Sequence, residues 1–388
     1  MKSVAVPYAS VDTPALLIDL DLWQANIDEI SQAAREAGVA LRPHVKVHQC
    51  PDLAKMQLAS GARGVEVGLI DQARVMADAG IEDIIVAHPF YGDHKFRKVE
   101  ELVSRPNLRL AIVMDMLEQG EALSEIGQRL GKRVPVYLKV DTGIRRYGTL
   151  PGMPTLSLAR QVNDLPGVQL VGIYAHESPG QTPPTQEGVS RVALEVGSVM
   201  CNMARLLRRD GLEIQDVSTG ASPTFFETCL WIKQGMLAEI TELHPGQRAI
   251  GDIVYSHVRG CDVDRITISL LSTVVSTSHS SYAVIDAGFK ALGAESMIGR
   301  RDAPGFFWNG MPSYGQIRGR DDLWLGRVGA ESGFVYYKED AAPLSLGERL
   351  EVIPNSAGLL FNIHDKAYGV RDGQIERQFE IAGRGKGT

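Results

Sequence analysis

Short apolar segments alternate with longer amphipathic segments along the first two thirds of this 388-residue chain. The short segments are rich in β-branched residues and predict β-strands, whereas the longer ones repeat apolar residues at helical spacing. In the segment 21–37, for example, Leu22, Ile27, Ile30 and Ala34 share one face of a helix. Expected strands lie at 15–18, 39–46, 64–67, 84–87, 109–113, 134–140, 170–174, 216–218 and 239–243. Repeated strand–helix units predict parallel strands with covering helices, either in a closed barrel or in an open doubly wound sheet.

The pattern changes after residue 255, where short strands with Gly-rich turns and little helix follow. Expected strands in this part are 266–275, 282–286, 333–337, 349–353, 367–371 and 374–379. We therefore predict two domains. The first is an α/β barrel over residues 12–255, and the second is a mainly β domain over 256–388 that also takes in residues 1–11.

Composition excludes several classes of protein. A hydrophobic share of 44% and a charged share of 22% are ordinary for a globular protein with a sizeable core. The net charge of −7 argues against nucleic acid or an anionic membrane as a partner. We see no apolar run long enough to span a bilayer and no leader segment at the start of the chain. The four cysteines are far apart and predict free thiols, so we expect a cytoplasmic enzyme with a small-molecule substrate.

One lysine has the setting of a nucleophile. Lys46 ends the apolar segment 39–46, which predicts a strand whose last residue lies at the mouth of the barrel. An ammonium group in apolar surroundings loses hydration, so its pKa falls and its free amine becomes available. A Schiff-base lysine for pyridoxal phosphate needs this property. Any lysine at the end of a strand would satisfy the same pattern.

Two turns have the small residues of a phosphate site. Ser218, Thr219 and Gly220 follow one expected strand, and Gly246 and Gln247 follow the next. Their backbone amides and hydroxyls can approach an anion closely. In a barrel the loops after the last two strands are the usual phosphate site. An ordinary Ser/Thr-rich turn is the alternative interpretation for the first of them.

Two further strand ends present polar side chains. Asp141 to Gly148 follow the expected strand 134–140, and within them Arg146 can hold the phenolic oxygen of a pyridoxal ring or a substrate carboxylate. A surface loop with ion-paired arginines fits the same residues. His176 follows the strand 170–174 and can sit beside a cofactor, or it can be a buried histidine with a structural hydrogen bond.

These segments together resemble the pyridoxal-phosphate enzymes with an alanine-racemase-type barrel, and in particular the D-threonine aldolase, D-serine dehydratase and 3-hydroxy-D-aspartate aldolase family. The resemblance covers nearly the whole chain. It is found in the segments 13–21, 42–48, 141–148, 218–220, 245–246, 284–291 and 383–387. It implies a pyridoxal-phosphate-binding TIM barrel followed by a β domain, with Lys46 as the Schiff-base lysine. It further implies His44, Arg146, His176 and the two phosphate turns as cofactor contacts, and a homodimer whose sites the partner completes.

The chain departs from this family where the relatives carry a metal-binding pair. Ser356 stands where the family has a histidine, and Gly358 where it has a carboxylate. Neither residue can replace those ligands for a divalent metal. Ligands from other positions, such as His364 and Asp365, are the alternative. We therefore expect that no divalent metal is bound.

The resemblance predicts a lyase, either an aldolase or a dehydratase, that acts on a β-hydroxy D-amino acid without a metal. Lys46 would then serve as the base at Cα, and His176 or His364 as the base toward the β-hydroxyl. Racemisation, epimerisation or transamination, which involve Cα alone, is the first alternative. A non-catalytic pyridoxal-phosphate carrier and a metal-dependent amidohydrolase are two more. The complete second domain speaks against the carrier, and the lack of an early His-x-His motif speaks against the amidohydrolase.

Overall fold

The computed structural model describes residues 8–177, 185–258, 261–293 and 306–387. The chain divides into two compact units, which are described separately. The barrel unit contains residues 27–46, 51–248 and 386–388. The β unit contains residues 1–26, 47–50 and 249–385.

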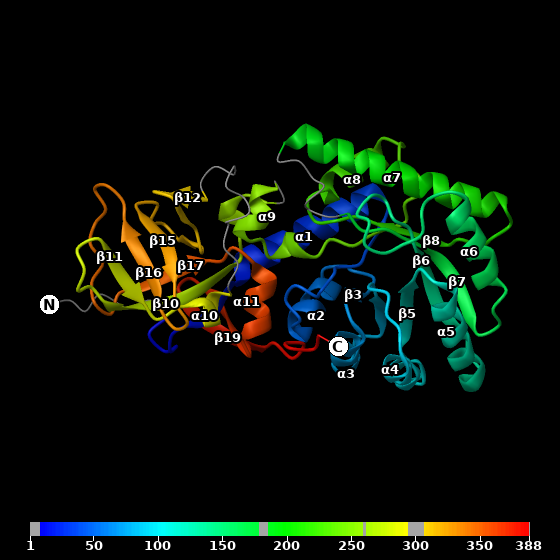
Figure 1. The fold of residues 1–388 in the computed structure, drawn as a ribbon, viewed down its shortest axis with the longest axis horizontal. Helices are drawn as coiled ribbons and strands as arrows, with labels where there is room; N and C mark the ends of the chain where they lie inside the picture. Colours follow the sequence, from blue (N-terminus) through cyan, green and yellow to red (C-terminus); the bar gives the residue numbers. More distant parts are fainter. Residues whose placement is uncertain (1–7, 178–184, 259–260, 294–305, 388) are drawn as a thin grey trace. The chain divides into compact units, whose positions relative to one another are not determined.

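The barrel unit is built on a parallel eight-stranded sheet (Figure 1). In chain order its strands are β2 (Ala40–Leu41), β3 (Val65–Val67), β4 (Asp83–Val86), β5 (Arg109–Met114), β6 (Val134–Lys139), β7 (Val168–Tyr174), β8 (Asp216–Thr219) and β9 (Glu242–Leu243). The strand order is β2-β9-β8-β7-β6-β5-β4-β3. The segment after β2 closes the sheet onto β3, because the Val45 amide donates to the Glu66 carbonyl at 2.8 Å and the Glu66 amide to the Pro43 carbonyl at 2.9 Å. The predicted parallel barrel is confirmed.

Helices alternate with these strands and pack on them from outside. They are the last part of α1 (Leu20–Ala37), then α2 (Pro51–Ala59), α3 (Ile70–Asp78), α4 (Asp93–Val103), α5 (Leu117–Leu130), α6 (Met153–Asn163), α7 (Gln186–Arg209) and α8 (Phe225–Lys233). Packing is closest where α5 meets the segment before β7. A Cβ atom on Gly127 would lie 2.0 Å from the Gly167 carbonyl oxygen, so only glycine permits this approach.

The amino-terminal ends of the barrel strands enclose a buried ionic network. Arg42, directly after β2, is fully buried. Its Nη1 atom lies 2.8 Å from Oδ1 of Asp83, and its Nε atom lies 2.9 Å from Oε2 of Glu242. Tyr137 donates from its hydroxyl to Asp216 at 2.6 Å. Buried charges are tolerated when they are paired in this way, so the network closes this end of the barrel without unpaired charge on Arg42.

The β unit has a nine-stranded mixed sheet. Its main path is β15 (Leu323–Val328), β16 (Gly333–Tyr337), β11 (Tyr282–Ile285), β10 (Ile268–Ser276), β1 (Ala15–Asp19), β18 (Lys366–Arg371) and β19 (Gln374–Glu380). The strand β17 (Arg349–Ile353) also pairs with β10, and β14 (Gln316–Ile317) pairs with β17. A separate hairpin joins β12 (Phe307–Trp308) and β13 (Met311–Pro312). The short helices α9 (Ile253–His257), α10 (Phe289–Leu292) and α11 (Ala357–Ile363) complete the described part.

The strand β1 is placed differently from our expectation. We expected 15–18 as a strand of the barrel, but β1 lies in the sheet of the β unit. Leu17 pairs antiparallel with Ser269 of β10 and parallel with Tyr368 of β18. A short apolar strand buried on both faces has the same pattern in a barrel and in the centre of a mixed sheet. The periodicity of apolar residues therefore identifies the strand but does not determine which sheet it joins.

None of the described helices combines the length and the apolar character that crossing a membrane requires.

Candidate active site

Lys46 lies in a turn five residues after the end of β2, at the carboxyl end of the barrel strands. The strand is shorter than predicted, although the amides of Arg42 and His44 still donate to the carbonyls of Leu243 and Pro245 beyond its end. Burial lowers the pKa of Lys46, and the nearby charge of Arg146 lowers it further, while Glu66 acts in the opposite direction. The amine is therefore released from its proton more easily than an exposed lysine, as the sequence predicted.

Beside it, His44 and Glu66 form a buried pair. The Nδ1 atom of His44 lies 3.1 Å from the Glu66 carbonyl oxygen, and its Nε2 atom lies 3.2 Å from Oε1 of the Glu66 carboxyl group. The hydroxyl of Tyr174 donates to the same Oε1 at 2.7 Å. Burial raises the pKa of Glu66 to about 8 and lowers that of His44 well below its usual value. Glu66 and Tyr174 were not predicted as site residues, because a lone carboxylate or phenol inside a strand belongs to no sequence motif.

A second lysine lies in the barrel interior. Lys139, the last residue of β6, is 4% exposed, and its Nζ atom lies 3.2 Å from the Ala87 carbonyl oxygen. The same atom is 4.4 Å from the centre of the Tyr174 ring. Burial lowers the pKa of Lys139 to about 8. Its place at the end of an expected strand was visible in the sequence, but Lys46 alone was selected as a candidate nucleophile.

His176 and His244 stack in the same part of the barrel. Their ring centres are 5.8 Å apart, and the ring of His244 lies parallel to that of Tyr174 at 4.5 Å. Burial lowers the pKa of His176 well below its usual value and that of His244 to about 3. Both rings are therefore held in the neutral form, because burial disfavours their protonated form. His176 was predicted, and His244, which directly follows β9, was missed.

The two predicted phosphate turns lie after β8 and β9. The backbone of Gly220 has φ +124°, and a Cβ atom on Gly246 would lie 2.9 Å from the His44 carbonyl oxygen, so both positions require glycine. The amides of Gly246 and Gln247 donate to Oγ of Ser222 at 2.9 and 2.8 Å. The hydroxyl of Ser218 is instead directed to the barrel interior, where it bonds Glu242 and His244.

Arg146 and His176 line one small cavity, together with Lys139, Asp141 and Tyr147. The guanidinium carbon of Arg146 lies 4.7 Å from the centre of the Tyr147 ring. The arginine loop and the histidine, which the sequence identified separately, are thus neighbours at the carboxyl end of the barrel.

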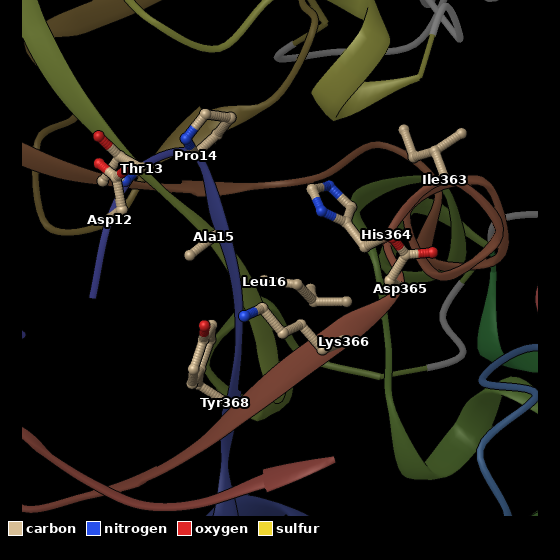
Figure 2. Close-up of a pocket in the computed structure, with 10 residues that line it drawn as sticks. All are labelled: Asp12, Thr13, Pro14, Ala15, Leu16, Ile363, His364, Asp365, Lys366 and Tyr368. Atoms are coloured by element: carbon tan, nitrogen blue, oxygen red, sulfur yellow. The ribbon is translucent and has the colours of Figure 1, made fainter. Parts of the chain in front are cut away.

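His364 belongs to the β unit, directly after α11. Its Nε2 atom lies 2.8 Å from the Ala291 carbonyl oxygen, and burial lowers its pKa. With Ile363 and Lys366 it lines one side of a cavity of about 320 Å³, and the segment from Asp12 to Leu16, which leads into β1, lines the other (Figure 2). Its role as a base stays a prediction.

Ser356 and Gly358 lie at the beginning of α11. Ser356 is the residue that precedes the helix, and a Cβ atom added to Gly358 would meet no neighbouring atom within 4 Å. Among the described residues, no group of three or more His, Cys, Asp or Glu side chains could hold a metal ion. The expectation that no divalent metal is bound stays a prediction.

Several buried polar atoms of the barrel unit have no hydrogen-bond partner within the described residues, and three of them belong to residues that interact electrostatically with Lys46, namely Glu66, His176 and His244. Among these atoms are Oε2 of Glu66, Oγ1 of Thr142, Nδ1 of His176, Oγ1 of Thr219 and Nε2 of His244. Buried polar atoms are normally paired, so a concentration of unpaired ones indicates a place for a polar ligand. The set contains the hydroxyl of Thr219 in the first phosphate turn, the hydroxyl of Thr142 in the arginine loop, and ring nitrogens of His176 and His244. It fits a small phosphorylated aromatic cofactor with a lysine at its aldehyde carbon.

Comparison with known proteins gives the same assignment for nearly the whole chain. Residues 18–251 match the family described as "Alanine racemase, N-terminal domain", and residues 267–370 match "Putative serine dehydratase domain". The D-threonine aldolase of Arthrobacter sp. is 30% identical over 98% of this chain and 94% of its own. The D-threo-3-hydroxyaspartate dehydratase of Delftia sp. is 28% identical over 90% and 91%.

A solved structure agrees with this comparison of sequences. The crystal structure of D-threonine aldolase from Filomicrobium marinum superposes with a TM-score of 0.86, at 28% identity, and covers 99% of this chain and 98% of that one. The predicted resemblance and the predicted fold class are thereby confirmed. The chain belongs to the alanine racemase N-terminal domain family, in the branch where the barrel is followed by a serine-dehydratase-type β domain.

Proposed function

We propose that the protein is a pyridoxal-phosphate-dependent lyase that acts on a β-hydroxy D-amino acid. The observation that carries this proposal is Lys46, whose pKa is lowered by burial at the barrel mouth, together with the unpaired buried polar atoms of Glu66, His176 and His244. The relatives with the same two domains over nearly their full length are an aldolase and a dehydratase. Both of these activities act on substrates with a β-hydroxyl group, as their names state.

The residues present fit the cofactor. Lys46 would hold its aldehyde carbon, and Thr219 and Gly220 would hold its phosphate, together with the amides of Gly246 and Gln247 in exchange for their bonds to Ser222. Arg146, His44 and His176 are proposed for its ring and the substrate carboxylate. Bound there, pyridoxal phosphate supplies an electron sink that stabilises negative charge at the substrate Cα.

The protein's own groups must then move the protons. The amine of Lys46, once displaced by the substrate, can take the Cα proton, because its pKa is already lowered. Cleavage of the Cα–Cβ bond instead requires a base for the β-hydroxyl proton. His176 is neutral and has an unpaired Nδ1 atom, so it is the group in the barrel unit that we propose for this step, with His364 as the second candidate.

We further propose that the reaction proceeds without a divalent metal. Serine and glycine at positions 356 and 358 support this, because neither supplies an imidazole, a thiolate or a carboxylate. The β-hydroxyl proton would then go directly to a protein base.

Chemistry restricted to Cα is the second candidate, and one observation favours it. Racemisation needs a second acid–base group, and Lys139 is a buried lysine whose pKa is lowered to about 8. Exchange of the Cα proton without release of an aldehyde or a keto acid would support it. A pyridoxamine product would instead indicate transamination.

A homodimer in the cytoplasm completes the proposal. Tyr91 and Leu150, in loops that follow β4 and β6, and Met153, the first residue of α6, are each more than 60% exposed, and such apolar residues support an interface at this rim. All four cysteines are free and buried, which supports a reducing compartment. Analytical ultracentrifugation measures the oligomeric state.

The visible absorbance spectrum of the protein and the products that it forms from D-amino acids together test the proposed function. The purified protein should show the visible absorbance of a lysine-bound cofactor, and Lys46→Ala should lose it entirely. Lys139→Met should keep the absorbance and serves as the control. The protein should release an aldehyde or a keto acid from D-threonine or D-3-hydroxyaspartate in the presence of a chelator. Loss of this activity with chelator would overturn the metal-free part of the proposal alone.

A further inference from the structure

A series of hydrogen bonds through four buried residues connects the ionic network at one end of the barrel with His244. The four residues are Arg42, Glu242, Ser218 and His244 itself. Arg42 donates from Nε to Oε2 of Glu242 at 2.9 Å. The hydroxyl of Ser218 donates to Oε1 of Glu242 at 3.0 Å, and the same oxygen lies 3.0 Å from Nδ1 of His244. All four residues are at most 1% exposed.

The positions of the protons in this series follow from its chemistry. Glu242 is paired with Arg42, so its carboxylate is an acceptor and takes the only hydrogen of the Ser218 hydroxyl. The oxygen of Ser218 must then accept from His244, which places a hydrogen on Nδ1. The carboxyl Oε2 of Glu66 lies 3.7 Å from the same Nδ1 atom and favours the same arrangement.

The other ring nitrogen of His244 is consequently a free acceptor. Burial keeps the ring neutral by lowering its pKa, so Nε2 carries a lone pair and no hydrogen. The backbone carbonyls of Ala175 and Gly220 lie close enough to the ring to raise its pKa, against the larger effect of burial, but Nε2 itself has no hydrogen-bond partner within the described residues. An acceptor buried without a partner is costly, and a donor on a bound molecule would satisfy it.

We propose that Arg42, Glu242 and Ser218 fix His244 in the tautomer with its hydrogen on Nδ1, so that Nε2 accepts a hydrogen bond from a donor on the bound molecule. That donor is an N–H or O–H group, supplied either by the protonated ring nitrogen of a pyridine cofactor or by the substrate hydroxyl. Ser218 and Glu242 are thus positioning residues that act through His244. The part that concerns the donor rests on the proposed function, whereas the tautomer does not.

The tautomer of the His244 ring can be measured in the protein without cofactor, by long-range ¹H–¹⁵N NMR with ¹⁵N-labelled histidine. The His244 signals are those that disappear in His244→Gln. We expect the hydrogen on Nδ1 in the wild type, and a preference at least about ten-fold weaker in Ser218→Ala, the effect of removing one hydrogen bond next to a charged group. Ser218→Thr keeps the hydroxyl and should restore the preference. Thr155→Val, which removes a buried hydroxyl bonded to the Leu150 carbonyl, is the matched control and should leave it unchanged.

Adding the cofactor first and the substrate second shows which of the two molecules supplies the donor. If the cofactor ring is the donor, the Nε2 signal should shift when pyridoxal phosphate alone is added. If the substrate hydroxyl is the donor, the shift should appear only after D-serine, and not after D-alanine. A hydrogen on Nε2 in the apo protein would overturn the proposal. So would an Nε2 signal that does not move although Lys46 has bound the cofactor, and failure of Lys46 to bind it would overturn the proposed function as well.

Discussion

The Nε2 atom of His44 lies 3.2 Å from the Oε1 atom of Glu66, and the opposite ring nitrogen is bonded to the backbone carbonyl of the same residue. A carbonyl can only accept, so Nδ1 of His44 carries a hydrogen. Nε2 and Oε1 are then two acceptors at hydrogen-bond distance unless one proton lies between them. Burial raises the pKa of Glu66 to about 8, which provides that proton at neutral pH. The carboxyl group next to Lys46 is therefore a neutral acid.

The shared proton between His44 and Glu66 predicts how Glu66→Gln changes the pH dependence of the rate at which Lys46 reacts with the cofactor. Below about pH 8 the carboxyl group is protonated and exerts no charge, so variant and wild type should form the lysine-bound cofactor at similar rates. Above this pH, ionised Glu66 raises the pKa of Lys46 in the wild type, and glutamine cannot. The variant should therefore react faster than the wild type only on the alkaline side. Stopped-flow absorbance between pH 6 and pH 10 measures the rates.

Glu36→Gln is the control for this experiment, since Glu36 is an exposed residue paired with Lys233 on the surface. Its rate profile should coincide with that of the wild type. Divergence of Glu66→Gln from the wild type already at pH 6 would show that Glu66 is ionised there, contrary to the shared proton.

The sequence predicted those site residues that combine a suitable functional group with a position directly after an apolar strand. Lys46, His176 and the turns at Gly220 and Gly246 each follow an apolar strand, so their common location is a consequence of the fold. Glu66, Lys139 and His244 were missed because their role depends on burial and on neighbours from other strands. The hydroxyl of Ser218 illustrates the same limit, because its direction toward Glu242 is a tertiary property.

The ionic network at the amino-terminal end of the barrel predicts a large effect on stability. Glu242→Leu leaves buried Arg42 with one of its two partners, and loss of a partner from a buried ion pair costs roughly 3–5 kcal/mol. Urea denaturation followed by circular dichroism measures the loss. Arg160→Ala, which removes an exposed ion pair with Asp210, should leave the free energy of unfolding nearly unchanged. Equal losses in the two variants would contradict the difference in burial.

Two glycines predict opposite outcomes for the same substitution. Gly127→Ala places a Cβ atom 2.0 Å from the Gly167 carbonyl oxygen, so α5 must move away from the start of β7. We expect a loss of more than about 3 kcal/mol, comparable with severe overpacking. Gly358→Ala meets open space within α11 and should be neutral, or stabilising by up to about 1 kcal/mol through helix propensity. Both are measured by thermal unfolding, and a stable Gly127→Ala protein would show that α5 can shift at little cost.

The same open space at Gly358 allows a direct test of metal dependence. The double variant Ser356→His/Gly358→Asp restores an imidazole and a carboxylate at the start of α11, and the added side chain at position 358 meets no atom at its Cβ. These ligands bind divalent metals, so we expect the variant to bind Zn²⁺ or Mn²⁺ at least about ten-fold more tightly than the wild type. Isothermal titration calorimetry measures the affinities. Ser356→Ala/Gly358→Ala is the control for altered packing and should bind no more tightly than the wild type. Tight stoichiometric binding by the wild type itself would show that other residues supply the ligands, and that the substitutions at 356 and 358 did not remove the metal.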